Sequence, residues 1–594
     1  SIISERTITS ILKDHSTVSR DRARLDVQNK VRFSLTSKKS VQDVLSKALE
    51  GQFADYEEYI TMMRTSALPD DTFLTTVRQA KECIHLLRPQ FMGFVETILS
   101  LNWTQRSPEI REEFKAFLLE LLVTHNKYAR IGIDRLVSTW IPEENAAESW
   151  PLGTPSEEVR ERLSDVHEVM AKLVELIPMA SSVIIRAIDT LFPYFKRPAH
   201  ILGGYLHNIL WLLTYQPIFL EDVLRIVLQR LLKVDVNAPR TEIEEAEEED
   251  EDMENIFEMD DVRNFKEDEM RNSLAESLDI CLQKLFAFVD QEFTKSSRSV
   301  DRTFRSIMNV FEAVILAAHN PHHIQFFIFY AMSLRKEFVQ HFVNSLWTKV
   351  CNPNVPPAMR QVCIYYIASL LARAKFLPMT LLRQMLKEFC LWANQYISRY
   401  DSSRIDVSIR AHGVFFSICQ AVFYVIAFRS KDLTSDKENL MFLQSLHLSA
   451  IVTSPLNPLR VCLPTIATAF AGVTRAHQLT YCHTILERNA RKKLATVYMS
   501  DVEMPEECLD TFFPFDPYLL KKSSKYIDKI YLKYQASEAE EKPVEEDATR
   551  KRKDTIGDED DFIAEKRLKA SSDLAKSHER ELQFSYSISP GFHT

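Results

Sequence analysis

The sequence predicts an all-α protein, a HEAT-repeat α-solenoid in which pairs of helices stack along the chain. The first observation is that the 594 residues include only 10 glycines, against roughly 7% in ordinary proteins, so glycine-dependent hairpins and phosphate loops are scarce. The second is that apolar residues recur at helical spacing through most of the chain. The third is that the helix pairs return about every 40 residues, a HEAT-type spacing. An irregular helical bundle would give the same pattern over a shorter length.

Composition divides the chain into five parts. Thirteen of the 20 residues 242–261 are acidic and none is basic, and like charges at this density oppose folding into a core. The parts are, in order, a flexible N-terminal arm (1–38), N-terminal HEAT-like repeats (39–240), an acidic disordered loop (241–268), C-terminal HEAT-like repeats (269–535) and a disordered polar tail with basic clusters (536–594).

The helical period is clearest around Pro217, which marks a turn between two amphipathic helices. Before it, apolar residues lie at i, i+3, i+4 and i+7, and the stripe continues after it. The residues before the turn are Leu206, Ile209, Leu210 and Leu213. The same arrangement returns on the two sides of Pro378. Stacked helix pairs of this kind present surfaces to partners instead of enclosing substrates.

Net charge and cysteine usage narrow the class of protein further. The net charge of −10 makes the whole molecule a poor electrostatic match for nucleic acid. Nine scattered cysteines without a C-x-x-C motif are expected to be reduced and buried, as in intracellular proteins. The first residues lack the apolar core of a signal peptide, and we expect no membrane span.

The motifs of catalysis are missing from the sequence. His319, His322 and His323 lack further ligands at metal-site spacing, so we interpret them as a solvated turn that opens a helix. Gly203 and Gly204 are followed by Tyr-Leu-His and not by the lysine and hydroxyl of a phosphate loop, and they predict close helix packing. We therefore expect no enzyme activity, no metal and no cofactor.

Two basic clusters in the tail, separated by about a dozen residues, are typical of a bipartite nuclear-import signal. Their residues are Arg550, Lys551, Arg552, Lys553, Lys566, Arg567 and Lys569. A charge-balanced solvated tail is the alternative, because acidic residues lie nearby. A further set of basic residues is a candidate accessory DNA contact, namely Arg429, Lys431, Arg488, Arg491, Lys492 and Lys493.

Several stretches resemble the RNA polymerase I-specific initiation factor family known as TIF-IA, with order and spacing that fit from about residue 30 to 535. The most specific is LDTFFPFDP at 509–517, continued by LKKSSKYIDKIY at 520–531. The others are LLKVDVNAP (231–239), HHIQFFIFY (322–330), LLARAKFLP (370–378), CQAVFY (419–424), LNPLRVCLP (456–464) and ILERN (485–489). Taken alone, Phe513 and Phe515 would also suit a segment that caps the apolar end of the solenoid.

The resemblance implies a HEAT-repeat factor of the nucleus and nucleolus that works without catalysis. Such a factor binds RNA polymerase I and bridges it to the promoter-bound core (selectivity) factor at ribosomal RNA genes, with at most a weak contact to the rDNA promoter. Phosphorylation controls the polymerase contact in this family. The alternative is a HEAT-repeat nuclear transport or scaffold protein, such as an importin-like carrier.

The resemblance also implies regulatory residues. Ser138 matches the region of the polymerase-facing patch. A regulatory Ser-Thr pair of the family would fall on Met179 and Ala180, so the adjacent Ser181 and Ser182 are the phosphorylation candidates here. Ser589, followed by proline, resembles the proline-directed serines of the family's tail.

Overall fold

The computed structural model describes residues 40–65, 68–177, 179–247, 269–399, 408–499, 508–509, 513–515 and 517–534. Within these ranges the chain is helical and forms no strand, and extended backbone pairs only in an isolated antiparallel bridge between Ala374 and Tyr531. The prediction of an all-α repeat fold is confirmed. Internal contacts divide the chain into two compact units, Ser1–Ile226 (unit 1) and Val227–Thr594 (unit 2). The division falls inside a helix, upstream of the acidic segment where composition placed it.

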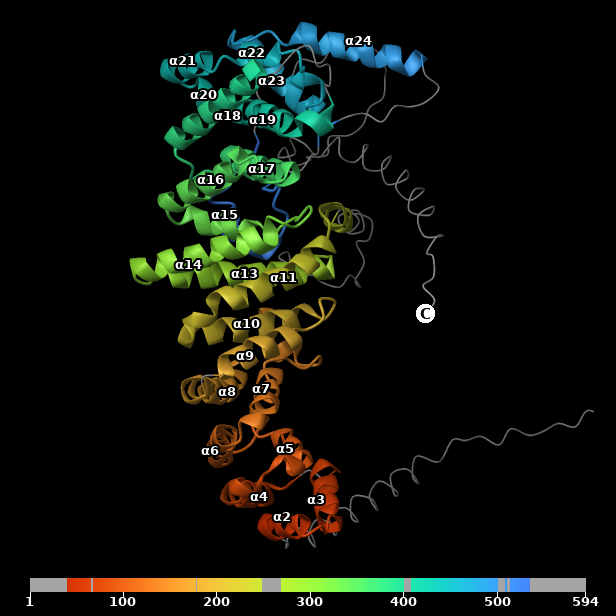
Figure 1. The fold of residues 1–594 in the computed structure, drawn as a ribbon, viewed down its shortest axis with the longest axis vertical. Coiled ribbons are helices and arrows are strands. Elements are labelled where there is room, and N and C mark those ends of the chain that lie inside the picture. The colour runs from red at the N-terminus through yellow and green to blue at the C-terminus, as the bar shows by residue number, and fades with distance from the viewer. Residues whose placement is uncertain are drawn as a thin grey trace, which may run out of the picture. The chain divides into compact units, whose positions relative to one another are not determined.

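Unit 1 is a run of antiparallel helices joined by short turns (Figure 1). Its helices are α2 (Val41–Leu49), α3 (Ala54–Thr65), α4 (Asp70–Glu82), α5 (Met92–Leu99), α6 (Pro108–Thr124), α7 (Ala129–Ser138), α8 (Glu157–Leu176), α9 (Ala180–Thr190) and α10 (Ala199–Tyr215), and α11 (Leu220–Val236) crosses the division. The predicted turn at Pro217 is present as a 3₁₀ turn, Pro217–Phe219, between α10 and α11.

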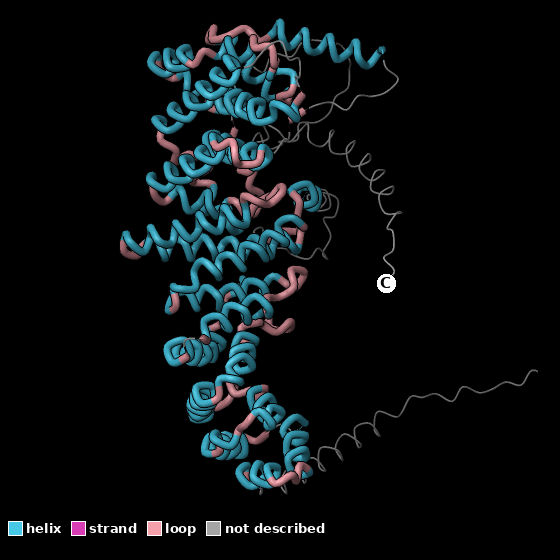
Figure 2. The backbone as a smooth tube through the Cα atoms, in the orientation of Figure 1, coloured by secondary structure: helices cyan, strands magenta, loops and turns pink. Residues whose placement is uncertain are grey.

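Unit 2 continues with further pairs, and the tube in Figure 2 shows helices joined by short loops. Its helices are α13 (Ser273–Phe293), α14 (Ser297–Val310), α15 (Phe326–Ser333), α16 (Lys336–Cys351), α17 (Pro357–Arg373), α18 (Met379–Arg399), α19 (Ile409–Phe428), α20 (Ser430–Thr434), α21 (Lys437–Ser445), α22 (Leu448–Val452), α23 (Pro464–Ala476), α24 (His483–Met499) and α25 (Lys521–Ile527).

Two helices of unit 2 are apolar on all sides because other elements cover them on all sides. Every residue from Cys363 to Arg373 in α17 and from Val414 to Ala427 in α19 is buried. Helix α19 has the length and hydropathy of a membrane span, yet 89% of its apolar window is buried within the protein. Its composition is therefore that of a central core helix packed against α17, α18 and α23.

Close packing explains the paired glycines of α10. A Cβ atom on Gly204 would lie 2.5 Å from Pro142 Cγ. Gly153 has a φ of +64°, and a Cβ atom there would lie 2.6 Å from the backbone carbon of Gly203. The prediction that Gly203 and Gly204 serve close packing is confirmed, because any side chain would push the loop off the helix.

The boundary predicted for the acidic loop is wrong at its start. Residues 241–247 are helical, and only part of the predicted range, 248–268, lies outside the described residues. The physical reason is that Ile243, 1% exposed, anchors this turn in the core. Burial of this apolar side chain, together with the hydrogen bond that Glu247 accepts from the amide of Arg271, thus holds a strongly charged sequence in a helix.

Candidate interaction site around Ser138

Ser138 is the last residue of α7, a helix that buries Ile133, Leu136 and Val137. These apolar positions face the neighbouring helices, with α9 the main contact of α7. Ser138 is left partly exposed, and its Oγ donates a hydrogen bond to the carbonyl oxygen of Arg135 at 2.6 Å. This bond closes the final turn of the helix and holds the hydroxyl at a fixed place on the surface of unit 1.

A cavity of about 510 Å³ opens beside Ser138, and we call it the Ser138 groove. It is formed by the loop after α5, one face of α6, the end of α7, residues 141–150 and the start of α8. Apolar and polar groups share its lining. The polar residues include Asn102, Gln105, Arg135, Thr139, Ser149 and Arg162. The groove therefore offers hydrogen-bonding and charged groups around an apolar floor, as sites that recognise a polypeptide segment do.

The floor of the groove is rigid. Trp103 stacks on Phe114 with ring centroids 5.2 Å apart, and both Trp103 and Trp150 are 4% exposed. Trp150 in turn lies against Gly204 of α10, where a Cβ atom would come within 2.8 Å of its ring. These contacts fix the walls before any partner arrives, which limits the entropy lost on binding.

Positive charge dominates the ionised groups of the groove. Arg135 is exposed and has no ion-pair partner in the described part of the chain, while Arg162 lies 4.0 Å from Glu158. Glu143 is the acidic residue among those lining the groove. The groove is thus suited to a segment that carries carboxylates.

An acidic cluster lies near the groove, where Glu112, Asp165 and Glu168 bring ligand atoms within 4.8 Å of one another. The ammonium group of Lys115 lies among them, 2.6 Å from Glu112, 2.9 Å from Asp165 and 2.7 Å from Glu168. Burial alone would lower the pKa of Lys115, but the three carboxylates raise it above its usual value. Lys115 therefore takes the place a metal ion would need.

The second pair of candidate serines begins α9. Ser182 is exposed, and its Oγ donates to the carbonyl oxygen of Met179 at 3.0 Å, while Ser181 is half-buried. Large apolar side chains are exposed beside them, Met179 at 71% and Leu176 at 56%. Ser182 is therefore accessible at a helix N-terminus, which favours negative charge. Ser589 and the seven basic tail residues lie outside the described residues.

The candidate DNA contacts do not form one patch. Arg429 is 8% exposed, and its guanidinium donates to the carbonyl oxygens of Leu371 and Ala374 and pairs with Asp432 at 2.8 Å. Its assignment as a phosphate contact is wrong, because its donors already satisfy buried acceptors that would otherwise be left unpaired.

Three other members of that set lie at the surface. Lys431 and Arg488 are exposed, and Arg491 lies 3.7 Å from Glu487 one turn away. Lys492 and Lys493 belong to α24, but their side chains lie outside the described residues.

The interpretation of the three histidines as a solvated turn is wrong for His323, which is fully buried. The carboxylate of Asp235 accepts hydrogen bonds from the backbone amides of His322 at 2.7 Å and His323 at 2.8 Å. Burial lowers the pKa of His323, which keeps the ring neutral. Asp235 is the one acidic residue in the LLKVDVNAP stretch, and this is the signal that the sequence offers. Spacing along the sequence could not connect Asp235 to a turn 87 residues away.

Residues 508–534 form what we call the C-terminal strap, described at 508–509, 513–515 and 517–534. The strap starts where the amide of Leu509 donates to the carbonyl oxygen of Val461 and runs back across unit 2. Phe513 contacts Tyr424 of α19 with centroids 4.5 Å apart, and Phe515 contacts Phe329 of α15 at 4.8 Å. In Figure 1 its blue trace lies beside the green helices α15 and α17.

The strap therefore does not cap the end of the solenoid, since its aromatic residues pack against helices in the middle of unit 2. The physical reason is that α15, α17 and α19 leave an apolar seam in which the rings of Phe513 and Phe515 are buried, which removes their apolar surface from water.

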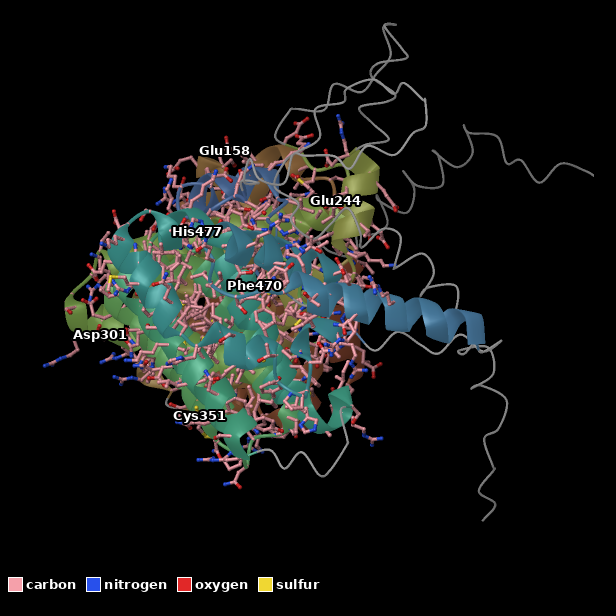
Figure 3. The ribbon with its side chains drawn as sticks, turned by 90° about the horizontal axis from the view of Figure 1, so that it is seen from above. Glu158, Glu244, Asp301, Cys351, Phe470 and His477 are labelled. Carbon is pink, nitrogen blue, oxygen red and sulfur yellow. The ribbon has the colours of Figure 1, made fainter. Side chains whose placement is uncertain are left out.

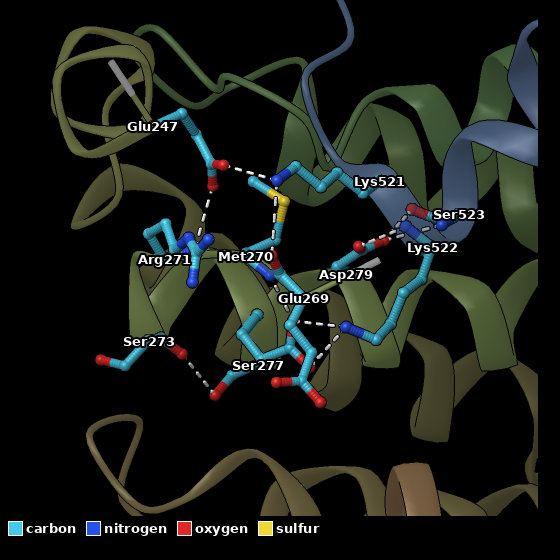
Figure 4. Close-up of polar contacts among 11 residues, drawn as sticks. Glu247, Glu269, Met270, Arg271, Ser273, Ser277, Asp279, Lys521, Lys522 and Ser523 are labelled. Atoms are coloured by element: carbon cyan, nitrogen blue, oxygen red, sulfur yellow. Dashed lines mark hydrogen bonds and ion pairs between the residues drawn. The ribbon is translucent and has the colours of Figure 1, made fainter. Parts of the chain in front are cut away.

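Polar contacts hold the far end of the strap against α13 (Figure 4). Asp279 of α13 accepts hydrogen bonds from the amides of Lys522 at 2.7 Å and Ser523 at 2.8 Å, and from the hydroxyl of Ser523. Lys522 pairs with Glu276 at 2.7 Å, and Lys521 pairs with Glu247 at 2.5 Å. Burial raises the pKa of Asp279, and the hydrogen bonds from the strap oppose that rise.

Fold and site together define a class of protein, a helical-repeat protein with a polar groove in unit 1 and a returning strap that packs across the repeats of unit 2. The chain belongs to the family of RNA polymerase I specific transcription initiation factor RRN3, and the match to this family covers residues 31–539.

The relatives cover most of this chain and most of their own lengths. The mouse protein called RNA polymerase I-specific transcription initiation factor RRN3 is 31% identical over 564 residues, covering 89% of this chain and 85% of its own. The Schizosaccharomyces pombe factor rrn3 is 25% identical, covering 83% of this chain and 86% of its own. The Caenorhabditis elegans factor tif-1A is also 25% identical, covering 74% of this chain and 73% of its own.

The fold also has a solved counterpart. The crystal structure of RNA polymerase I transcription initiation factor Rrn3 superposes with a TM-score of 0.66 at 18% identity. It covers 84% of this chain and 98% of that one. At this level of identity the likeness establishes the shared fold.

Proposed function

We propose that this chain is an RNA polymerase I transcription initiation factor of the nucleus and nucleolus that acts by binding and not by catalysis. It binds the polymerase and bridges it to the promoter-bound core factor at ribosomal RNA genes. The observation that carries the proposal is the family match, which runs through both units from residue 31 to 539. The names of the mouse, worm and fission-yeast relatives support the polymerase as the partner.

The Ser138 groove is the part of unit 1 that we assign to the polymerase. It is preformed, it has an apolar floor, and it carries the guanidinium groups of Arg135 and Arg162. A carboxylate-bearing segment of the polymerase would form charge-assisted hydrogen bonds to these groups.

Phosphorylation of Ser138 gives a direct means of control. A phosphate adds about −1.5 to −2 charges at neutral pH. In the groove it would compete with a partner's carboxylates for Arg135 and repel them. Loss of about 1.4 kcal/mol weakens the complex tenfold. Ser181, Ser182 and Ser589 are further sites of the same kind of control.

The experiment is co-purification of the full chain with purified RNA polymerase I at low salt, before and after phosphatase treatment. We expect binding by the unphosphorylated chain, and weaker binding by Ser138→Glu. Ser398→Glu is a matched control, because Ser398 is exposed and its Oγ also bonds the carbonyl three residues earlier, at 2.9 Å. No polymerase binding by the unphosphorylated wild type would refute the proposed function, while equal binding by the two variants would remove only the groove from it.

The remaining assignments have their own tests. Import should fall when the two tail clusters, beginning at Arg550 and Lys566, are neutralised. A weak rDNA promoter contact through Lys431, Arg488 and Arg491, together with Lys492 and Lys493, would appear as promoter binding with a steep salt dependence. If neutralising the two tail clusters left the rate of nuclear import unchanged, the tail clusters would be excluded as the import signal.

A further inference from the structure

Helix α14 has one strongly apolar face and one strongly basic face. Its apolar face is buried, with Phe304 stacked on Phe338 of α16 at a centroid distance of 3.9 Å. The opposite face exposes Arg298, Arg302 and Arg305. The helix is fixed by its apolar side, so its arginines are carried on a rigid support.

The three arginines lie in line. At 100° per residue, positions i, i+4 and i+7 fall within about 60° of one another around a helix, and they span about 10 Å along it. None of the three has an ion pair or a hydrogen bond within the described part of the chain. The nearest carboxylate along the helix, Asp301, lies 3.6 Å from Arg335 instead.

This charge arrangement works against the helix that carries it. Arg298 stands in the first turn of α14, where the helix dipole is positive, and that turn holds no acidic residue. Arg298 and Arg302 are also like charges at i, i+4, and Arg302 and Arg305 at i, i+3. An anionic partner would relieve both effects at once.

The basic face continues onto the start of α16. Arg335 and Lys336 lie there, and Arg335 contacts Ser297 of α14 at 3.3 Å. Asp301 and Glu337 are the acidic residues exposed among them. In Figure 3 Asp301 is labelled at the rim of the view, where side chains project away from the ribbon. On a chain of net charge −10 this surface is locally positive.

We propose that the arginine face of α14, made of Arg298, Arg302 and Arg305, binds an acidic helical segment of a partner protein. A helix that presents carboxylates at i, i+4 and i+7 matches the spacing of the three guanidinium groups and can pair with each through two hydrogen bonds. The inference concerns a surface in unit 2 and does not depend on the proposed groove in unit 1.

A protein partner fits this face better than a nucleic acid strand. A phosphodiester chain carries a charge at every unit, so it would bring phosphates against Asp301 and Glu337, and the net charge of the chain would oppose its approach. A protein helix can carry neutral side chains at the positions that face Asp301 and Glu337. The exposed face of α14 also has no aromatic side chain on which a base would stack.

The test uses a fluorescein-labelled peptide of alanine and glutamine with glutamates repeated at i, i+4 and i+7, and measures fluorescence anisotropy against the full chain at low salt. A peptide of the same composition with its glutamates spread around the helix is the control ligand. The variant is Arg298→Glu with Arg302→Glu and Arg305→Glu. The control variant, Lys387→Glu with Lys437→Glu and Arg475→Glu, removes the same charge from exposed positions elsewhere in unit 2.

We expect the arginine variant to bind the peptide about tenfold more weakly or worse, since charge-assisted contacts are lost, and the control variant to bind it like the wild type. Binding should weaken as salt rises. The melting temperature should change little, because glutamate at position 298 suits the start of the helix while the three glutamates repel one another as the arginines do; if the variant melted lower, the charge-neutral Arg→Gln triple would replace it.

Three outcomes would overturn the inference. One is that the wild type does not bind the peptide, including the case in which a short labelled DNA duplex binds through the arginines instead, which would assign the face to nucleic acid. The second is an equal loss of peptide binding in the arginine variant and the control variant. The third is equal affinity of the wild type for the two peptides.

Discussion

Replacement of Phe515 by alanine tests whether the C-terminal strap is a structural part of unit 2. Phe515 is fully buried, with its ring 4.8 Å from Phe329, 5.6 Å from Phe326 and 5.7 Å from Tyr366. Its amide donates to Ser369 Oγ at 3.0 Å. These contacts join the strap to α15 and α17.

The expected loss follows from burial. Truncation of a fully buried phenylalanine costs about 3–5 kcal/mol, from the lost transfer of the ring out of water and the cavity left behind. The upper part of that range applies here, because the contacting residues belong to two helices that are fixed by other neighbours and cannot close on the void. Phe515→Leu keeps most of the volume and should lose less.

Urea titration followed by circular dichroism, with limited proteolysis of the strap, measures the effect. Tyr481→Ala is the control, because Tyr481 is 67% exposed and should lose little. Phe329→Ala combined with Phe515→Ala should cost less than the sum of the two, since the rings contact each other. A loss below about 1 kcal/mol for Phe515→Ala, or a strap no more open to protease, would refute the assignment of the strap to the core.

The other predictions concern a buried histidine, two glycines and the cysteine thiols. His167 stacks between Trp140 and Trp211, and burial lowers its pKa to about 4. The stability that the neutral ring contributes is therefore complete above its unfolded pKa near 6.5 and falls by about 3 kcal/mol as the pH drops toward 4. Replacement of His167 by phenylalanine should flatten this part of a curve of unfolding free energy against pH. Gly153→Ala should lose at least about 1–2 kcal/mol because of its left-handed backbone, whereas Gly472→Ala, in α23 with open space around it, should gain about 0.5–1 kcal/mol by thermal melting. Cys351 and Cys508 are exposed and the other seven cysteines are buried, so an aromatic disulfide reagent should titrate two thiols quickly in the native chain and nine after denaturation.

Much of the site lay beyond sequence reasoning for one reason, which is that spacing along a chain carries no information about contacts between distant segments. The periodic stripe before Pro217 predicted α10 because helical burial repeats locally. The partner of Asp235 and the position of Phe515 depend on segments 87 and 146 residues away. Ser138 was found through resemblance, while the groove beside it is built from five separate stretches and has no local signal.

The sequence by itself determined the helical-repeat class, the turns at proline, the close packing at Gly203 and Gly204 and the burial of most cysteines, because each depends on residues within a few turns of one another or on composition. Only the tertiary structure decided that Arg429 donates hydrogen bonds to buried carbonyl oxygens, that His323 is buried and that the LDTFFPFDP segment returns across the middle of unit 2. Those outcomes are set by where apolar surface is left uncovered after the repeats have stacked, and the chain has no such surface until it folds.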